Sequence, residues 1–240
     1  MHSLTARPLK YTNFEYLDVL PPVHRLPWLV EQAAGKNILD LGAFDETVDS
    51  KRNSKYWLHG ALAKRAQRVI GIDNSDNLPP NGIQTSVNSG IYRGDIFSLG
   101  ELVNRYAIDL IVAGELVEHL PNTQAFLQSL KADPVLAGMH LILTTPNAMG
   151  MHNLLMGMAR REVQHPDHLQ LYTLKTLNTL CLRSGFSRWQ IRPYHVSFSE
   201  MILASSGIKK VMIKSFEWII NLFEKAAPML SGGWIIDVTI

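Results

Sequence analysis

The chain has 240 residues, of which 46% are hydrophobic and 18% are charged, and this composition excludes a wholly disordered chain. A single cysteine, Cys181, excludes an intrachain disulfide framework; we expect it in the core of a cytoplasmic protein. The net charge of +2, without a Lys/Arg cluster, argues against a nucleic-acid partner, and no apolar stretch reaches the roughly 18 residues of a membrane span.

The elements expected along the chain alternate between strands and helices. Residues 1–36 precede this pattern, and Pro21, Pro22 and Pro27 indicate an N-terminal helical cap broken into short pieces. Apolar runs and runs with helical spacing then follow one another. The expected strands are 37–41, 68–73, 91–95, 108–114 and 139–145, and the expected helices are 55–66, 122–131 and 174–184. Such alternation predicts an α/β fold, with a mostly parallel sheet and helices on both of its faces.

Two segments interrupt the alternation. The first is a polar loop at 45–54, and the second is a helical insertion at 197–231, near the C-terminus of the main domain 37–240. Both the cap and the insertion are expected to close over a substrate as a lid. The stretch 208–226 within the insertion carries an apolar stripe, which indicates core packing or the seam of a homodimer. Lysines flank this stripe, so contact with a membrane surface is a weaker alternative.

Acidic residues and a glycine stand where three of the expected strands end. The first strand ends in Asp40-Leu-Gly42, the second ends at Asp73, and Asp95 and Ile96 close the third. Ligands of open α/β sheets bind at this carboxyl edge. Gly42 allows backbone to approach a ligand closely, and Asp73 can accept both hydroxyls of a ribose. Asp95 is suitably placed to meet an adenine amino group.

This order of residues resembles the class I S-adenosylmethionine (SAM)-dependent methyltransferases, whose first motif reads roughly D/E-x-G-x-G-x-G. Asp40 and Gly42 match the motif, whereas Phe44 and Glu46 stand where the family usually has its next two glycines. The resemblance implies a Rossmann-like, mostly parallel seven-stranded sheet with SAM as cofactor. It implies the SAM-binding residues Asp40, Gly42, Asp73, Asp95, Ile96 and Glu115.

A second motif follows the fourth expected strand. Glu115, Glu118 and His119 are spaced i, i+3 and i+4, which on a helical turn places all three on one face. Two carboxylates and an imidazole on one face are unfavourable unless a positive charge lies between them, and a divalent cation would meet this need. A solvated helix start is the alternative, because acids are favourable near a helix N-terminus.

Together with the later segment 141–147 (LILTTPN), this motif resembles one branch of the class I methyltransferases, which carries E-x-x-E-H and T-P-N at these places. The branch includes small-RNA 3′-terminal 2′-O-methyltransferases, which bind a divalent metal, and bacterial glycan and natural-product O-methyltransferases. The resemblance implies catalytic roles for Glu118 and His119. It implies the metal ligands Glu115, Glu118, His119 and His168, with His165 as the alternate for the last. These ligand types do not choose among Mg²⁺, Mn²⁺, Fe²⁺ and Zn²⁺.

Metal-assisted O-methylation of a hydroxyl on a small molecule, such as a sugar or a natural-product intermediate, is therefore the leading expectation. His119 acting as a general base without metal is the alternative mechanism. An RNA 2′-O-methyltransferase is the second functional hypothesis. A non-catalytic scaffold subunit with the SAM fold is the third, because Phe44 and Glu46 replace motif glycines and the late helix carries an apolar stripe.

Overall fold

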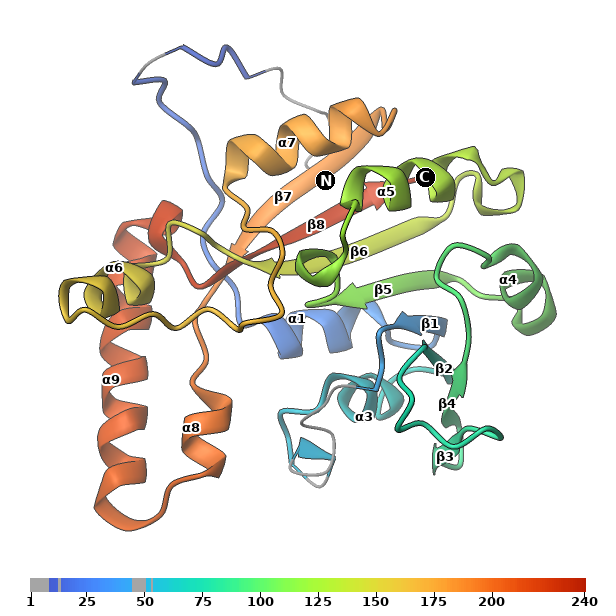
Figure 1. The fold of residues 1–240 in the computed structure, drawn as a ribbon, viewed down its shortest axis with the longest axis horizontal. Coiled ribbons are helices and arrows are strands. Elements are labelled where there is room, and N and C mark those ends of the chain that lie inside the picture. The colour runs from blue at the N-terminus through green and yellow to red at the C-terminus, as the bar shows by residue number, and fades with distance from the viewer. Residues whose placement is uncertain (1–8, 13, 45–50, 53) are drawn as a thin grey trace.

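The computed structural model describes residues 9–12, 14–44, 51–52 and 54–240. An eight-stranded sheet in the order β3-β4-β2-β1-β5-β6-β8-β7 runs through the molecule (Figure 1). The strands are β1 (Asn37–Leu41), β2 (Arg68–Asp73), β3 (Ile83–Ser86), β4 (Ser89–Arg93), β5 (Leu110–Gly114), β6 (His140–Pro146), β7 (Arg188–Tyr194) and β8 (Gly233–Thr239). The α-helices are α1 (Arg25–Gln32), α3 (Leu58–Ala63), α4 (Gly100–Tyr106), α5 (Thr123–Ala132), α6 (Met151–Met158), α7 (Leu174–Arg183), α8 (Ser199–Leu203) and α9 (Gly207–Ala226). Short 3₁₀ turns are η1 (Val117–His119), η2 (Pro134–Leu136) and η3 (Pro228–Leu230).

The sheet is mixed, and it has one strand more than expected. The strands β4, β2, β1, β5 and β6 are parallel, whereas β8 runs antiparallel to both β6 and β7. The unexpected strand is β3, which pairs antiparallel with β4. A two-residue connection at Val87 and Asn88 folds the chain back as a hairpin, and β4 consequently begins at Ser89 rather than at residue 91. The expectation of a seven-stranded sheet is therefore wrong, while that of an α/β fold is confirmed.

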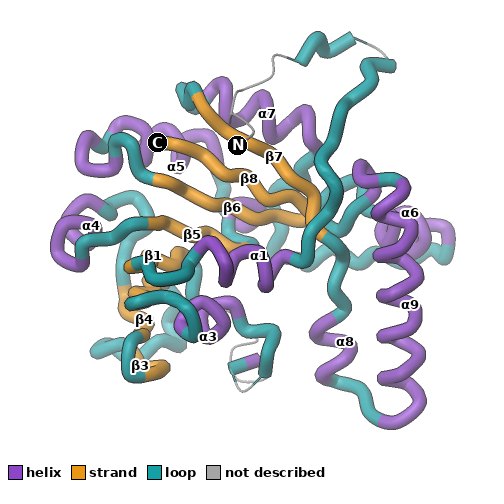
Figure 2. The backbone as a smooth tube through the Cα atoms, turned by 180° about the vertical axis from the view of Figure 1, so that it is seen from behind, coloured by secondary structure: helices purple, strands orange, loops and turns teal. Residues whose placement is uncertain are grey.

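Helices cover both faces of the sheet, as the alternation predicts. One core cluster packs α4, α5 and α7 against the sheet, and a second packs α1 and α3 against the opposite face (Figure 2). Consecutive residues of one strand point into different clusters: Ile111 belongs to the first and Val112 to the second. Cover on both faces explains why the parallel strands are almost continuously apolar. Cys181 is buried in the first cluster, so its expected place in the core is confirmed.

The N-terminal segment differs from the expected cap. Among residues 9–12 and 14–36, α1 is the one helix, and Pro27 lies in its first turn, where a backbone N–H has no partner within the helix. Before α1, Val23 forms an isolated bridge with Tyr194 at the end of β7. Leu29 and Ala33 are fully buried against the sheet. The prediction of several helical pieces is thus wrong for the described part of this segment, since α1 belongs to the core.

The insertion before the last strand is present and consists of α8, α9 and η3, between β7 and β8. In Figures 1 and 2, α8 and α9 lie side by side and project away from the sheet. Of the twenty residues of α9, only Ile220 and Glu224 are buried, so core packing does not explain its apolar stripe. No helix in the described ranges is both long enough and apolar enough to span a bilayer. Most of the polar loop, including Glu46, lies outside the described residues.

Candidate active site

The acidic motif after β5 does not form the helical turn that its spacing suggests. Glu115 has a backbone φ of 55°, in the left-handed region that non-glycine residues rarely adopt. A 3₁₀ turn, η1, begins two residues later. The left-handed residue turns the chain, so Glu115 does not lie on one helical turn with Glu118 and His119. The predicted helical turn is therefore wrong, although Glu115 still lies near enough to Glu118 to raise its pKa.

Glu118 is a buried carboxyl group without a hydrogen-bond partner. Its side chain is 0% exposed, and neither carboxylate oxygen has a partner with hydrogen-bond geometry among the described residues; Thr145 and Arg25 nearby offset only a small part of the cost of burial. Burial, and then the nearby negative charge of Glu115, raise the pKa of Glu118 to about 8. Isolated charges are rarely left in this state, because removing a charge from water without compensation is costly. The carboxylate is thus available to a ligand that brings positive charge.

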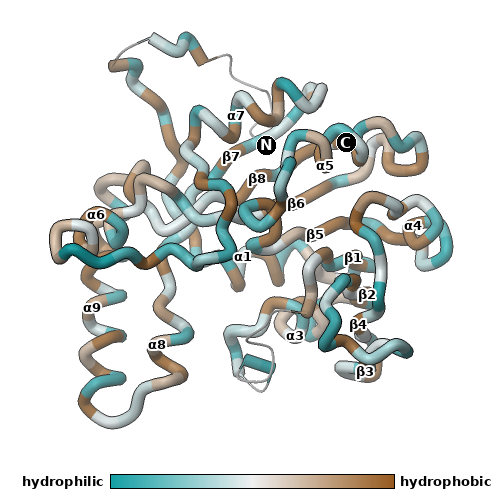
Figure 3. Tube along the Cα trace, viewed as in Figure 1, coloured by the Kyte–Doolittle hydropathy of each residue, from teal (hydrophilic) through white to brown (hydrophobic). Residues whose placement is uncertain are grey.

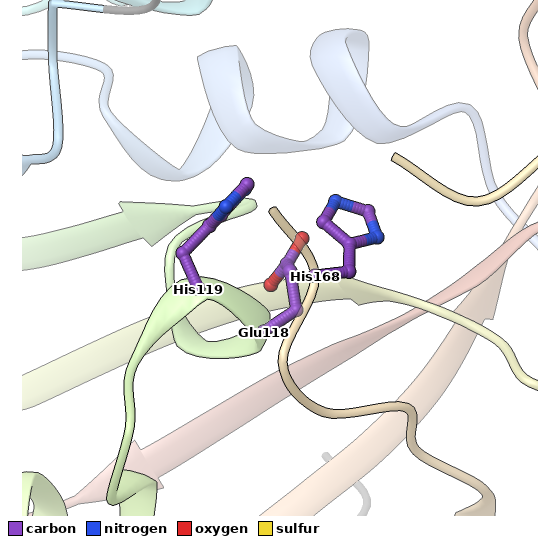
Figure 4. A group of neighbouring side chains, drawn as sticks. All are labelled: Glu118, His119 and His168. Carbon is purple, nitrogen blue, oxygen red and sulfur yellow. The ribbon is translucent and has the colours of Figure 1, made fainter. Parts of the chain in front are cut away.

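Two imidazoles lie beside this carboxylate. Ligand atoms of Glu118, His119 and His168 all lie within 4.8 Å of one another, and the three side chains converge in Figure 4. The rings of His119 and His168 are edge-to-face, with centroids 4.8 Å apart. Burial, and then the neighbouring His119, lower the pKa of His168, so its neutral, ligand-competent form is favoured near pH 7. The structure thus brings together three of the four residues expected to hold a metal.

Backbone hydrogen bonds hold the distant histidine in place. His168 precedes α7 in a loop whose next two residues, Leu169 and Gln170, both donate their N–H groups to the carbonyl oxygen of Glu118, at 2.9 and 3.1 Å. By contrast, the ring of His165 lies 6.2 Å from that of His119, is exposed, and is 3.7 Å from the carboxylate of Asp167. The geometry therefore favours His168 over His165 as the third member of the group.

Glu115 belongs to a different polar cluster. Its Oε1 accepts hydrogen bonds from Tyr194 Oη at 2.9 Å and Thr144 Oγ1 at 3.0 Å, and lies 3.7 Å from Arg25 Nε. The Arg25 Nε also donates to Thr144 Oγ1 at 3.0 Å. Burial and the charge of Glu115 raise the pKa of Tyr194 well above its ordinary value, so this hydroxyl remains a donor. Sequence reasoning missed Arg25, Thr144 and Tyr194, because they come from three separate elements and share no motif.

The expected cofactor residues gather at the carboxyl ends of β1, β2 and β4. Gly42 has a φ of 69°, and a Cβ at this position would meet Leu116 Cδ1 at 3.0 Å. Asp73 accepts the N–H groups of Phe44 at 3.0 Å and Ser75 at 2.8 Å, so its carboxylate joins the turns after β1 and β2. Burial raises the pKa of Asp73 above its ordinary value. The glycine turn and the half-buried carboxylate fit the ribose end of a nucleoside cofactor.

Asp95 and Asp40 differ in exposure and in the groups that their carboxylates contact. Asp95 is exposed after β4, and its carboxylate accepts the N–H of Phe97 at 2.9 Å, while Ile96 is partly buried against the core. Asp40, in contrast, is 2% exposed and lies 3.0 Å from His59 Nδ1. Asp40, which the resemblance places among the SAM-binding residues, thus has its buried carboxylate paired with an imidazole.

Comparisons with known proteins agree with this architecture. A family described as the methyltransferase domain matches residues 11–191. No curated protein sequence matches the chain. Among solved structures, a SAM-dependent methyltransferase from Archaeoglobus fulgidus is 14% identical with a TM-score of 0.50, and the match covers 90% of this chain and 91% of that one.

Two further similar structures carry the name Hen1. The small RNA methyltransferase HEN1 is 15% identical with a TM-score of 0.52, and the match covers 97% of this chain but only 27% of HEN1. The methyltransferase domain of bacterial CtHen1-CN is 16% identical with a TM-score of 0.50, and the match covers 90% of this chain and 98% of that one. At these identities the structures establish a shared fold, and the family match covers most of the sequence. The chain therefore belongs to the methyltransferase domain family and has the class I fold of SAM-dependent methyltransferases.

Proposed function

We propose that this methyltransferase transfers the methyl group of SAM to a hydroxyl oxygen of a small-molecule acceptor, with a divalent cation held by Glu118, His119 and His168. The observation that carries the proposal is the buried, unpartnered carboxylate of Glu118 beside two imidazoles. A donor set of one carboxylate and two imidazoles fits Mn²⁺, Fe²⁺ or Zn²⁺, and Mg²⁺ if waters complete its shell. The lack of a hydrogen-bond partner for the Glu118 carboxylate also fits a metal ligand, because a bound cation would supply the missing positive charge.

The residues of this chain would share the work as follows. Gly42, Asp73, Asp95 and Ile96 would bind the nucleoside half of SAM at the carboxyl edge of the sheet. In the reaction, the acceptor oxygen forms a bond to the methyl carbon, the sulfur–carbon bond breaks to release S-adenosylhomocysteine, and the hydroxyl proton passes to solvent water. A bound divalent cation supplies acidity, because it lowers the pKa of a coordinated hydroxyl. The remaining contribution is to position the hydroxyl in line with the methyl group.

Glu115 is a positioning residue in this proposal rather than a fourth ligand. Its carboxylate is held by Tyr194, Thr144 and Arg25 and contributes to the raised pKa of Glu118. If His119 acts as a general base without metal, one of its ring nitrogens accepts the hydroxyl proton directly. The two mechanisms differ in one measurable property, which is saturable metal binding.

Calorimetric titration of SAM and of its demethylated product, S-adenosylhomocysteine, into EDTA-stripped protein tests the proposal. The titration is then repeated with Mg²⁺, Mn²⁺ and Zn²⁺. We expect micromolar binding of SAM, and separate, saturable binding of metal that is lost in Glu118→Ala. The double variant Glu118→Ala/His119→Ala should lose turnover while its affinity for SAM changes by no more than a few-fold. Full activity in the double variant would reject both the metal and the base mechanism. Absence of SAM binding would instead favour the scaffold hypothesis.

RNA 2′-O-methylation is the second candidate, and the observation in its favour is the fold shared with HEN1, whose name refers to small RNA. The net charge of +2 favours a small acceptor instead, because phosphate contacts need clustered Lys and Arg. Fluorescence anisotropy with a short labelled RNA separates the two. Salt-sensitive binding of RNA in the micromolar range would favour the second candidate, and its absence at low salt would favour the first.

A further inference from the structure

Helix α9 turns its apolar side chains away from the protein. Successive residues of a helix are about 100° apart, which places Ile213, Glu217, Ile220 and Glu224 on one face. This face contains both buried residues of the helix. The opposite face, named here the outer face, spans an arc of about 160° by the same geometry. It carries eight large, exposed apolar side chains: Ile208, Val211, Met212, Phe216, Trp218, Ile219, Leu222 and Phe223. Figure 3 shows hydrophobic segments along α9, beyond the edge of the sheet.

Polar contacts fix this orientation. Glu224 is fully buried and accepts a hydrogen bond from the backbone N–H of Val196, and it lies 2.7 Å from His195 Nδ1. About two turns earlier in the helix, Glu217 accepts the N–H of Phe198 at 2.6 Å. A rotation of α9 about its axis that buried the outer face would break these contacts. It would leave the carboxylate of Glu224 without its partners, which is costly. The apolar surface therefore faces outward because the helix is anchored through its acids.

Basic residues border the outer face on both sides. In the helical projection, Lys209 follows one margin, and Lys214 and Lys225 follow the other. The two acids of this fully described helix are both engaged on the inner side. A shallow hollow on the outer face is lined by Val211, Lys214, Ser215, Trp218 and Ile219. Apolar area and lysine thus lie next to each other, without a negative charge on the same surface.

We propose that the outer face of α9 binds an anionic lipid surface, with the helix lying in the plane of the interface. Aromatic and aliphatic side chains would enter the boundary between headgroups and acyl chains, and the lysines at the margins would reach the lipid phosphates. Trp218, which is 67% exposed, is of the type enriched at this depth. Leu154 and Met158 add exposed apolar area on α6, which contacts α9.

The lysines at the margins of the outer face favour a lipid surface over a second copy of the chain as its partner. A symmetric dimer through the outer face would bring the lysine margins of two copies toward one another, and α9 offers no free acid to pair with them. An anionic bilayer supplies the missing negative charge along the whole helix. Lysine near such a surface contributes about fivefold to partitioning per residue at moderate salt.

Flotation of the 240-residue chain with vesicles tests the proposal. Vesicles of phosphatidylcholine alone are compared with vesicles containing 30% phosphatidylglycerol, at low and high salt. We expect binding to the anionic vesicles that salt weakens, and a loss of at least tenfold in Trp218→Ser/Leu222→Ser. Lys214→Gln/Lys225→Gln should lose most of the preference for anionic lipid. The matched control is Val87→Ser, which removes an exposed apolar side chain from the β3–β4 turn and should bind like the wild type.

Fluorescence provides a second reading that does not depend on the amount bound. Three of the five tryptophans, Trp57, Trp189 and Trp234, are buried, so a blue shift on adding anionic vesicles should come mainly from Trp218 and disappear in Trp218→Phe. Absence of binding to every vesicle would overturn the proposal. So would a wild-type dimer in sedimentation velocity that dissociates in Trp218→Ser/Leu222→Ser, because the outer face would then be the dimer seam.

Discussion

Replacing Glu118 by glutamine should stabilise the metal-free protein, and increasingly so as pH rises. The carboxyl group is fully buried and has no hydrogen-bond partner, and its pKa is raised from the ordinary 4.5 to about 8. The folded state therefore holds a proton that the unfolded state has already lost. Folding stability contributed by this group is fully present below pH 4.5 and is lost as pH rises through about 8. Glutamine has nearly the same shape and stays neutral throughout.

The size of the effect follows from the same pKa. At about 1.36 kcal/mol for each pKa unit, the rise corresponds to an upper limit of about 5 kcal/mol at pH 8.5. Relaxation that lets water reach the carboxylate reduces this figure. We expect Glu118→Gln to exceed the wild type by about 2–4 kcal/mol at pH 8.5 and by less than about 1 kcal/mol at pH 5, in the free energy of unfolding.

Urea denaturation in EDTA at pH 5, 7 and 8.5 measures this difference. The control is Val87→Ser, at an exposed position of the β3–β4 turn, where neither side chain titrates and the difference should be the same at every pH. Saturating Mn²⁺ should then stabilise the wild type but not Glu118→Gln, since a ligand stabilises only the state that binds it. A difference between the free energies of unfolding of the wild type and Glu118→Gln that is the same from pH 5 to 8.5 would refute the reasoning. Glu118 would then not be a buried, unpaired carboxyl group, and the metal site built on it would fall as well.

Four further outcomes are expected. Asp73→Ala should weaken SAM binding by about 10- to 100-fold in calorimetry, the effect of losing hydrogen bonds to a charged acceptor. His168→Ala should lose metal binding while His165→Ala keeps it within a few-fold, and the reverse would exchange their roles. Glu115→Gln should retain metal binding and reduce the loss of stability between pH 5 and 8.5, because removing a nearby negative charge lowers the folded-state pKa of Glu118 toward its ordinary value; loss of metal instead would make Glu115 a ligand. Burial raises the pKa of Cys181 to about 12, so a thiol reagent at pH 8 should react only as fast as the fold opens, and rapid reaction in native buffer would contradict its core position.

The parts of the fold that the sequence predicts are those with a periodic signal. The apolar run at β5 and the cap of α5 at Asn122, whose side chain accepts the N–H of Ala125, are examples. The hairpin strand β3 escapes prediction because half of its side chains are exposed and it is four residues long. For α9, periodicity identifies an apolar face without indicating on which side the sheet lies. That choice depends on Glu224 meeting His195, a contact between separate elements.

The sequence also predicts some residues of the candidate site and not others. Spacing along the chain places Glu118 next to His119, and the resemblance to a known motif adds His168, which lies about fifty residues later. Neither indicates that Glu115 adopts a left-handed backbone, since no local feature of a glutamate favours that region. The partners that hold it, Arg25 and Tyr194, lie far away in sequence and become neighbours only when the sheet forms.

This division of the acidic motif has a physical consequence for the site. In the expected arrangement, Glu115 and Glu118 would both have contacted the ion, together with His119 and His168. Instead, Tyr194 and Arg25 hold the carboxylate of Glu115 in place near Glu118, where it adds to the effect of burial on the Glu118 pKa. A cation that enters the group would therefore meet one carboxylate directly and the field of a second. The two carboxylates together favour a divalent over a monovalent ion, because the Coulomb attraction grows with the charge of the ion, and the positive charge of Arg25 beside them offsets part of this preference.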